Sequence, residues 1–326
     1  MLATVLIVLQ GLTFRAADVI SWAGLLLAVL CFIWQVSWIL PYTNLWRKEV
    51  GNAADAQTSG AEISILTANV LMHNRNVEGL LALVRKYEPD ILVTLETDAW
   101  WQTHLDELEV DMPHTVKCPL DNLYGMHVYS RLPFDAAEIA YLVEEDVPSI
   151  HLATTLDNSD AAVQIHFLHP APPSPTENTC STQRDAELIV VAETLCDSSK
   201  PTIVAGDLND VAWSYTTRLF RKISGLLDPR VGRGMFNTFH AQYWFMRWPL
   251  DHLFHSDHFS VQEIRRLPAN GSDHFALLAR LVYTPADDTN EAPLNADSED
   301  HQAAGNIVAG NTKDNAVAEV AQKVGL

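Results

Sequence analysis

The sequence predicts an α/β domain that follows an apolar N-terminal helix. Three observations lead to this prediction: an uncharged apolar run over residues 20–40, an alternation of short apolar runs with amphipathic stretches over residues 62–283, and polar residues directly after several of those runs. With 326 residues, of which 48% are hydrophobic, the chain can bury a sizeable core as one large domain or two ordinary ones.

The apolar run Ile20–Leu40 predicts a membrane-spanning helix. It carries no charge over 21 residues, and a helix of that length spans roughly 30 Å, the thickness of a bilayer core. A buried core helix seldom runs this long without a charge, and a cleaved signal peptide would need a basic segment before it. We therefore expect residues 1–46 to form a membrane anchor with its main span at 20–40. A second, short span over residues 1–14 is left open, and too few basic residues flank the helix to fix which side of the membrane the rest faces.

The stretch 62–283 predicts the alternating elements of an α/β domain. Ile63–Val70 is a predicted buried strand, residues 77–84 repeat apolar side chains at helical spacing before Pro89, and Ile91–Leu95 returns as a strand. Together they form a strand-helix-strand unit. Further strands are predicted at residues 151–156, 163–168, 202–205 and 276–282, and a further helix at residues 185–195.

The segments on either side of this domain are polar. Residues 47–61 are small and polar in large part and predict a linker. Residues 284–326 are rich in Asp, Asn, Glu, Ala and Thr, which predicts a disordered acidic tail.

Charge and cysteine content narrow the classes of function. The formal net charge of −20 repels polyanions, which argues against tight nonspecific binding of long nucleic acid. A small phosphate ester held through a cation is not excluded, because the cation inverts the local electrostatics. The four cysteines Cys31, Cys118, Cys180 and Cys196 show no CxxC and no regular spacing, so they predict no disulfide framework, although a Cys118–Cys180 pair stays open.

Polar side chains follow several predicted strands directly. Asp207 and Asn209 stand two residues apart at the end of one strand, so alternation along the extended chain lets both address one ligand. The other positions of this kind are Asn69, Glu96 and His169, followed later in the chain by Asp251-His252 and Asp273-His274. Each could be an ordinary turn residue, but strand ends on one edge of a sheet converge in space. We therefore expect one site.

The residue types suit metal-assisted attack of water on a phosphate ester. Glu96 would be a hard oxygen ligand for Mg²⁺ or Mn²⁺, and Asp207 would orient or deprotonate the water. Asn69 and Asn209 would donate hydrogen bonds to carboxylates or phosphoryl oxygens. A histidine–carboxylate pair would stabilise the developing charge.

The ordered motifs T-A-N-V, L-E-T, S-R-L-P, L-H-P, G-D-L-N-D, L-D-H and G-S-D-H resemble those of the endonuclease/exonuclease/phosphatase superfamily, which has the DNase I-like fold. The resemblance covers residues 62–283. With the apolar N-terminal helix, the chain is similar to the membrane-anchored bacterial branch, which implies the inner (cell) membrane. The resemblance implies a four-layer sandwich of two mixed β-sheets flanked by helices.

The resemblance also implies roles for individual residues. Glu96 would be the principal metal ligand, supported by Asn69, with Asp273 near the metal. Among the catalytic residues, His274 would be oriented by Asp251, the pair Asp207 and Asn209 would handle the water and the phosphate, and His169 would be a second phosphate-contacting histidine. Leu71 stands where some nucleases of the family carry an acidic residue, which weakens the case for a second metal site there.

Two further groups allow alternatives. His252, His255 and His258 fall at intervals of three, but residues i and i+3 of a strand point to opposite faces, so surface or supporting histidines are favoured over a zinc site. Trp213, Trp244 and Trp248 could flank the cleft or simply pack.

The function expected from these observations is that of a membrane-anchored, divalent-metal-dependent phosphoesterase, with a phosphodiesterase favoured. Its substrate would be a lipid headgroup, a small ester or nucleic acid, and no stable protein partner is evident. The alternatives are a nuclease and a catalytically inactive, membrane-tethered binding module of the same fold.

Overall fold

The computed structural model describes residues 2–13, 18–55, 60–157, 159, 161–173, 181–196, 198–284 and 290–311. The chain divides into two compact units. The first comprises Met1–Arg47 with Val231–Gly234, and the second comprises Lys48–Arg230 with Met235–Leu326. Cys180 lies outside the described residues.

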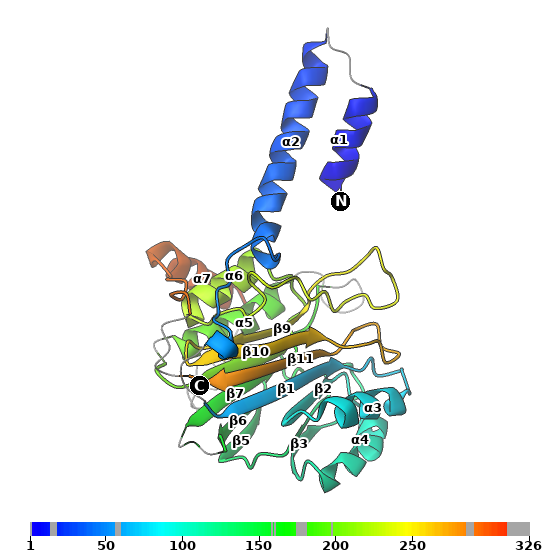
Figure 1. Ribbon diagram of the computed structural model, residues 1–326, viewed down its shortest axis with the longest axis vertical. Coiled ribbons are helices and arrows are strands. Elements are labelled where there is room, and N and C mark those ends of the chain that lie inside the picture. The colour runs from blue at the N-terminus through cyan, green and yellow to red at the C-terminus, as the bar shows by residue number, and fades with distance from the viewer. Residues whose placement is uncertain are drawn as a thin grey trace. The chain divides into compact units, whose positions relative to one another are not determined.

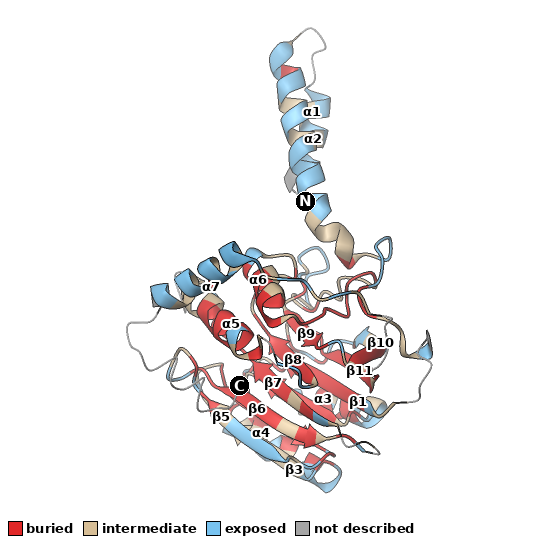
Figure 2. Ribbon diagram, turned by 90° about the vertical axis from the view of Figure 1, so that its left-hand side faces the viewer, coloured by how far each residue is buried: buried red, intermediate tan, exposed pale blue. Residues whose placement is uncertain are grey.

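The first unit is built on two helices, α1 (Leu2–Leu12) and α2 (Val19–Ile39). Asp18 caps α2, because its side chain accepts hydrogen bonds from the N–H groups of Ile20 and Ser21. The stretch Val19–Tyr42 has a mean hydropathy of 2.2 and is long enough to cross a membrane. Most of α2 is exposed (pale blue in Figure 2), the reverse of what water-soluble packing gives an apolar helix.

The second unit contains two β-sheets. The first has the strand order β10-β11-β1-β2-β4-β3 and the second has the order β5-β6-β7-β8-β9. The strands of the first sheet are β1 (Glu62–Asn69), β2 (Ile91–Leu95), β3 (His114–Cys118), β4 (Met126–Ser130), β10 (Phe259–Arg266) and β11 (Leu277–Tyr283). Those of the second are β5 (Ala136–Ala140), β6 (Ser149–Thr155), β7 (Ala162–Leu168), β8 (Thr202–Asp207) and β9 (Asp251–His255).

Both sheets are mixed, and each contains one pair of parallel neighbours. β1 pairs in parallel with β2 in the first sheet, and β7 pairs in parallel with β8 in the second. A helix connects the strands of each pair: α3 (Val77–Tyr87) follows β1 and α5 (Thr182–Leu195) follows β7. Such connections are needed because parallel strands cannot be joined by a tight turn. As a result, the carboxyl ends of both strands in a pair lie at the same sheet edge.

The hydrophobic core confirms the predicted four layers (Figure 1). One cluster, with Ile65, Val93 and Ile203, fills the space between the two sheets. A second cluster joins the outer face of the first sheet to α3 and α4 (Ala99–Leu105). A third joins the outer face of the second sheet to α5, α6 (Tyr215–Ser224) and α7 (Ser298–Asn311). Alternation of side chains along each strand supplies an inner and an outer apolar face.

The predicted boundaries of the domain need two corrections. Residues 298–311 of the predicted disordered tail form helix α7, because Ala304 is fully buried and Ile307 and Val308 pack on the third cluster. Few apolar residues suffice when the helix packs against an existing surface. The predicted linker 47–61 is also not free of the domain, since Val50 is fully buried in the central core and Asn52 bridges to Val261.

Candidate active site

The ends of the parallel strands bring the predicted polar residues together. Asn69 ends β1, and its amide Nδ2 donates to Glu96 Oε1 at 2.8 Å and to Asp207 Oδ2 at 3.1 Å. One amide therefore joins residues from the first sheet to a residue from the second. Glu96 follows β2 directly and Asp207 ends β8. This is the convergence that the strand-end pattern predicts.

A glycine in β8 permits the close approach of the next member of the site. A Cβ on Gly206, whose φ is +147°, would lie 1.9 Å from the carbonyl oxygen of Leu168. Only glycine fits where the backbones come this close. His169 follows Leu168, and its Nε2 lies 4.0 Å from Asp207 Oδ2.

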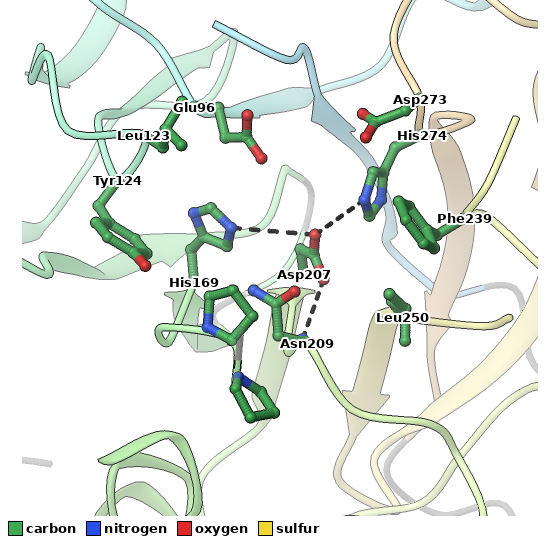
Figure 3. Close-up of a pocket in the computed structure, with 12 residues that line it drawn as sticks. Glu96, Leu123, Tyr124, His169, Asp207, Asn209, Phe239, Leu250, Asp273 and His274 are labelled. Atoms are coloured by element: carbon green, nitrogen blue, oxygen red, sulfur yellow. Dashed lines mark hydrogen bonds and ion pairs between the residues drawn. The ribbon is translucent and has the colours of Figure 1, made fainter. Parts of the chain in front are cut away.

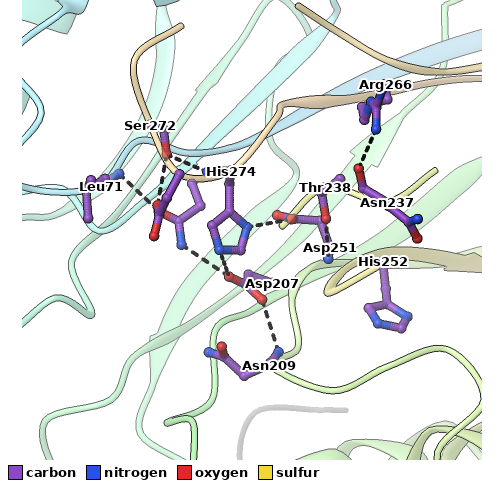
Figure 4. Close-up of polar contacts among 12 residues, drawn as sticks. Leu71, Asp207, Asn209, Asn237, Thr238, Asp251, His252, Arg266, Ser272 and His274 are labelled. Atoms are coloured by element: carbon purple, nitrogen blue, oxygen red, sulfur yellow. Dashed lines mark hydrogen bonds and ion pairs between the residues drawn. The ribbon is translucent and has the colours of Figure 1, made fainter. Parts of the chain in front are cut away.

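His274 stands between two carboxylates (Figure 4). Its Nδ1 lies 2.8 Å from Asp251 Oδ2 and its Nε2 lies 3.4 Å from Asp207 Oδ2. All three side chains are at most 5% exposed. Burial lowers the pKa of His274, but the carboxylates of Asp207 and Asp251, together with that of Asp273, outweigh this effect and raise the pKa to about 10. The ring is therefore an imidazolium at neutral pH.

The other charged groups of the site are also shifted. Burial raises the pKa of Asp207, but the imidazoles of His274 and His169 outweigh burial and leave its pKa below the usual value. Burial lowers the pKa of His169 to about 4, so this imidazole is neutral. Burial also raises the pKa of Glu96 to about 7. Such shifts are typical of functional sites.

These residues line a partly open pocket of about 380 Å³ (Figure 3). The walls include Glu96, His169, Asp207, Asn209, Asp273 and His274, together with Leu123, Tyr124, Pro172, Pro173, Phe239 and Leu250. Eight residues were predicted for the site. Six of them line the pocket, while Asn69 and Asp251 lie behind it, bonded to Glu96 and His274 respectively.

Asn209 supports the site through its backbone as well as its side chain. Its N–H donates to Asp207 Oδ1 at 3.0 Å, and its Nδ2 donates to the carbonyl of Pro170 at 3.0 Å. Arg184 stabilises the turn after β8, because its Nη1 donates to the Asn209 carbonyl at 2.7 Å. One hydrogen of the Asn209 amide remains for the pocket, since an amide nitrogen carries two.

The donor set next to Glu96 suits a hard divalent cation. Glu96 Oε2 is buried and has no hydrogen-bond partner among the described residues. In Figure 3 the side chains of Glu96 and Asp273 both reach into the pocket. An unsatisfied, buried carboxylate oxygen is costly unless a cation or proton neutralises it. Glu96, Asn69 and Asp273 therefore fit the expected Mg²⁺ or Mn²⁺.

A second arrangement of possible ligand atoms is better explained without a metal. Within the described ranges, candidate ligand atoms of Asp207, Asp251 and His274 lie within 4.8 Å of one another. However, the two ring nitrogens of His274 each face a carboxylate. A protonated imidazole uses both nitrogens as donors and has no lone pair for a metal. His274 is hydrogen-bonded to Asp251 and ion-paired with Asp207.

The sequence patterns did not predict several residues that line the pocket. Tyr124 lies with its ring centroid 5.5 Å from that of His169, and Phe239 lies 4.9 Å from His274. Gly125 was an available signal for Tyr124, because a Cβ there would lie 1.8 Å from the Thr97 carbonyl, which requires a close approach next to Glu96. No local pattern marks Phe239.

The histidine triplet does not form a zinc site. His252 is fully buried, with Nδ1 2.7 Å from Arg230 Nη2 and Nε2 2.8 Å from the Asp210 carbonyl. His255 is also fully buried and contacts Phe259. Of the two expected alternatives, surface or supporting histidines, the surface position does not apply to His252 and His255, because both are fully buried.

Acidic, amide and imidazole groups therefore meet at the joint edge of two mixed sheets. A model of the endonuclease/exonuclease/phosphatase family matches residues 66–274 of the 326. The chain therefore belongs to the endonuclease/exonuclease/phosphatase family, a group of metal-dependent phosphoesterases and nucleases.

Solved structures share the fold at low sequence identity. An endonuclease/exonuclease/phosphatase from Beutenbergia cavernae is 17% identical with a TM-score of 0.56, over 69% of this chain and 72% of that one. The human Nocturnin catalytic domain with bound sulfate is 17% identical with a TM-score of 0.56, over 70% and 97%. D. rerio TDP2 complexed with a single-strand DNA product is 15% identical with a TM-score of 0.56, over 68% and 98%. No curated protein matches the chain.

Proposed function

We propose that this protein is a membrane-anchored, divalent-metal-dependent phosphodiesterase that hydrolyses a phosphate ester with an activated water. The observation that carries the proposal is His274, an imidazolium held between Asp251 and Asp207 and facing a pocket that also contains the unsatisfied Glu96 carboxylate. The anchor would be α2, which would place the protein in the bacterial inner membrane.

Each residue has a role that follows from its charge and contacts. Asp207 is ionised, so it would accept a hydrogen bond from the attacking water and orient it. His274 would stabilise the negative charge that develops on the phosphoryl oxygens. Asp251 would act through His274 by fixing its ring. His169 and Asn209 would donate neutral hydrogen bonds to the phosphate.

Glu96 and Asp273, with Asn69 behind them, would hold Mg²⁺ or Mn²⁺. When bound, the cation supplies positive charge that offsets the phosphate ester and the surrounding carboxylates. Asn69 would keep Glu96 oriented, since its amide donates to Glu96 Oε1. Leu71 offers no carboxylate at the position where a second metal would need one, and its N–H donates to Asn69 Oδ1 at 3.0 Å.

The test is a substrate panel offered to the full chain in detergent micelles. The panel contains a soluble phosphodiester, a soluble monoester, a phospholipid and single-stranded DNA, the last because a structural neighbour holds such a product. Each is offered with Mg²⁺, with Mn²⁺ and with a chelator. We expect diester hydrolysis that the chelator abolishes and added cation restores.

Two variants separate an enzyme from a binding module. Asp273→Ala should abolish turnover with folding retained, whereas the exposed Asp257→Ala should not change it. Hydrolysis that survives the chelator, or that Asp273→Ala leaves unchanged, contradicts the assignment. If no ester in the panel is turned over with either cation, the inactive binding module is the better description.

A further inference from the structure

The loop between α6 and β9 carries large apolar side chains in exposed positions. Tyr243, Trp244, Phe245 and Met246 are 48%, 81%, 50% and 42% exposed. We call residues 240–248 the aromatic loop. In Figure 1 this yellow segment projects from the body of the second unit. A contiguous exposed apolar patch on a folded domain marks an interaction site.

The backbone of the aromatic loop is an ordered hairpin. At its base, Phe239 and Trp248 form an antiparallel bridge. Above it, the N–H of His240 donates to the Met246 carbonyl at 3.0 Å, and the N–H of Met246 donates to the Tyr243 carbonyl at 3.3 Å. The exposed side chains are therefore presented on a defined turn.

The base of the aromatic loop is part of the active-site wall (Figure 3). Phe239 and Leu250 flank the loop in sequence, and both line the pocket. The N–H of Ala241 donates to the Asp273 carbonyl at 2.6 Å. A surface that binds the aromatic loop therefore lies next to the mouth of the pocket.

The charge around the aromatic loop differs from that of the whole chain. The chain has 41 acidic residues, yet none lies between Asp228 and Asp251. Arg247 is the basic residue of the loop, and its guanidinium lies over the ring of Phe275 at 5.0 Å. A segment that carries no carboxylate adds no repulsion of its own toward lipid phosphates.

The composition favours a bilayer over nucleic acid as the occupant. A protein that binds single-stranded nucleic acid presents a cationic groove that follows the phosphate backbone of the ligand. The aromatic loop, in contrast, has one arginine in a chain of net charge −20. Trp and Tyr concentrate at the interface of a bilayer, where amphipathic rings are stable. The same chain contains α2, which is long and apolar enough to span a membrane.

We propose that the aromatic loop inserts into the interface of a lipid bilayer, and that the adjoining pocket acts on a phosphate ester carried by a lipid. The second half of this proposal rests on the proposed phosphodiesterase function. The first half does not, because insertion needs only the exposed side chains and the bilayer.

The first experiment measures hydrogen exchange of the full chain in phosphatidylcholine nanodiscs and in a lipid-free amphipathic polymer. We expect amides of residues 242–246 to exchange at least about tenfold more slowly in nanodiscs, as expected if apolar side chains leave water. Amides around the exposed Val110, in the 3-10 helix η3 (Asp106–Val110), are the control and should not change. Equal exchange of residues 242–246 in both media overturns the proposed insertion into the bilayer. Protection of these amides by a single-stranded oligonucleotide, without protection by nanodiscs, overturns it as well.

The second experiment compares hydrolysis of a lipid-borne phosphodiester in nanodiscs with that of a soluble phosphodiester. In the double variant Trp244→Ser/Phe245→Ser, the ratio of lipid to soluble rates should fall at least about tenfold. Val110→Ser is the matched exposed control. An unchanged ratio overturns the lipid substrate. If neither ester is hydrolysed by the unmodified chain while exchange still shows protection, the proposed function fails and the docking stands.

Discussion

Histidine is buried in two regions of the second unit, in opposite states of charge. In the active site, His274 lies between Asp251 and Asp207, and its pKa is raised to about 10. In the second sheet, His151 on β6 and His166 on β7 face one another with Nδ1 atoms 2.8 Å apart. Burial lowers the pKa of His151 to about 4, and burial together with the neighbouring His151 holds the pKa of His166 well below its usual value. Burial alone makes a histidine neutral, and adjacent carboxylates make it charged.

The comparison also shows what does not identify a site. His166 Nε2 is buried and has no hydrogen-bond partner among the described residues, as is true of Glu96 Oε2. Glu187 on α5 is likewise buried, with its pKa raised by burial to about 8. Only Glu96 belongs to the walls of the active-site pocket. A shifted pKa indicates function where opposed charges and access to a ligand accompany it.

The largest effect should follow from the loss of the charged histidine. His274→Ala removes the imidazolium that faces the pocket, so kcat/KM on the hydrolysed ester should fall by about 10²–10⁴-fold. Steady-state kinetics on the full chain measures this. His104→Ala changes an exposed histidine and should stay within about twofold of the unmodified rate. If the alanine variant unfolds, His274→Gln serves instead, and an unchanged rate in a folded variant would sink the assignment.

A smaller effect should follow from Asp251→Asn. One of the carboxylates that raise the pKa of His274 loses its charge, so the pKa of His274 should fall toward its ordinary value. We expect kcat/KM at pH 7 to drop about ten- to hundredfold, and the alkaline limb of its pH profile to move to lower pH. A uniform loss at every pH would instead indicate a purely structural role for Asp251.

The smallest effect concerns the neutral pair. His151 and His166 have folded-state pKa values below the unfolded value of about 6.5. The stability they contribute is therefore complete above pH 6.5 and is lost as the pH falls toward 4. At pH 5 each histidine should cost up to about 2 kcal/mol of unfolding free energy relative to pH 7.

The double variant His151→Leu/His166→Leu should flatten this acid dependence, because leucine does not titrate and Ser149 keeps its bond to the Ala140 carbonyl. Denaturant unfolding of the full chain in micelles at pH 7 and pH 5 measures it, with His104→Leu as the control. A steeper acid loss in the double variant would show that the pair is charged in the folded state.

The sequence predicted much of the fold because local patterns carried it. The strand-helix-strand unit appears at β1, α3 and β2 with nearly the predicted limits, and β7, α5 and β8 repeat it. The strands β3, β4, β5, β9 and β10 were not predicted. Of these, β3, β5 and β10 are edge strands with several exposed or half-buried residues, so their apolar patterns are weak. Helix α7 was missed for a related reason, as its few apolar side chains pack on a surface formed by α5 and α6.

The sequence by itself determined which polar residues would meet, because carboxyl ends of parallel strands share a sheet edge and the chain places Asn69, Glu96, His169 and Asp207 there. Only the tertiary structure decided their states. The 2.8 Å contact of Asp251 with His274 and the place of Tyr124 and Phe239 in the wall depend on how the two sheets face each other. The neutral pair His151–His166 depends instead on the pairing register of β6 and β7 within one sheet. Charge in a buried group is set by neighbours a few ångströms away in space, and these come from distant parts of the chain.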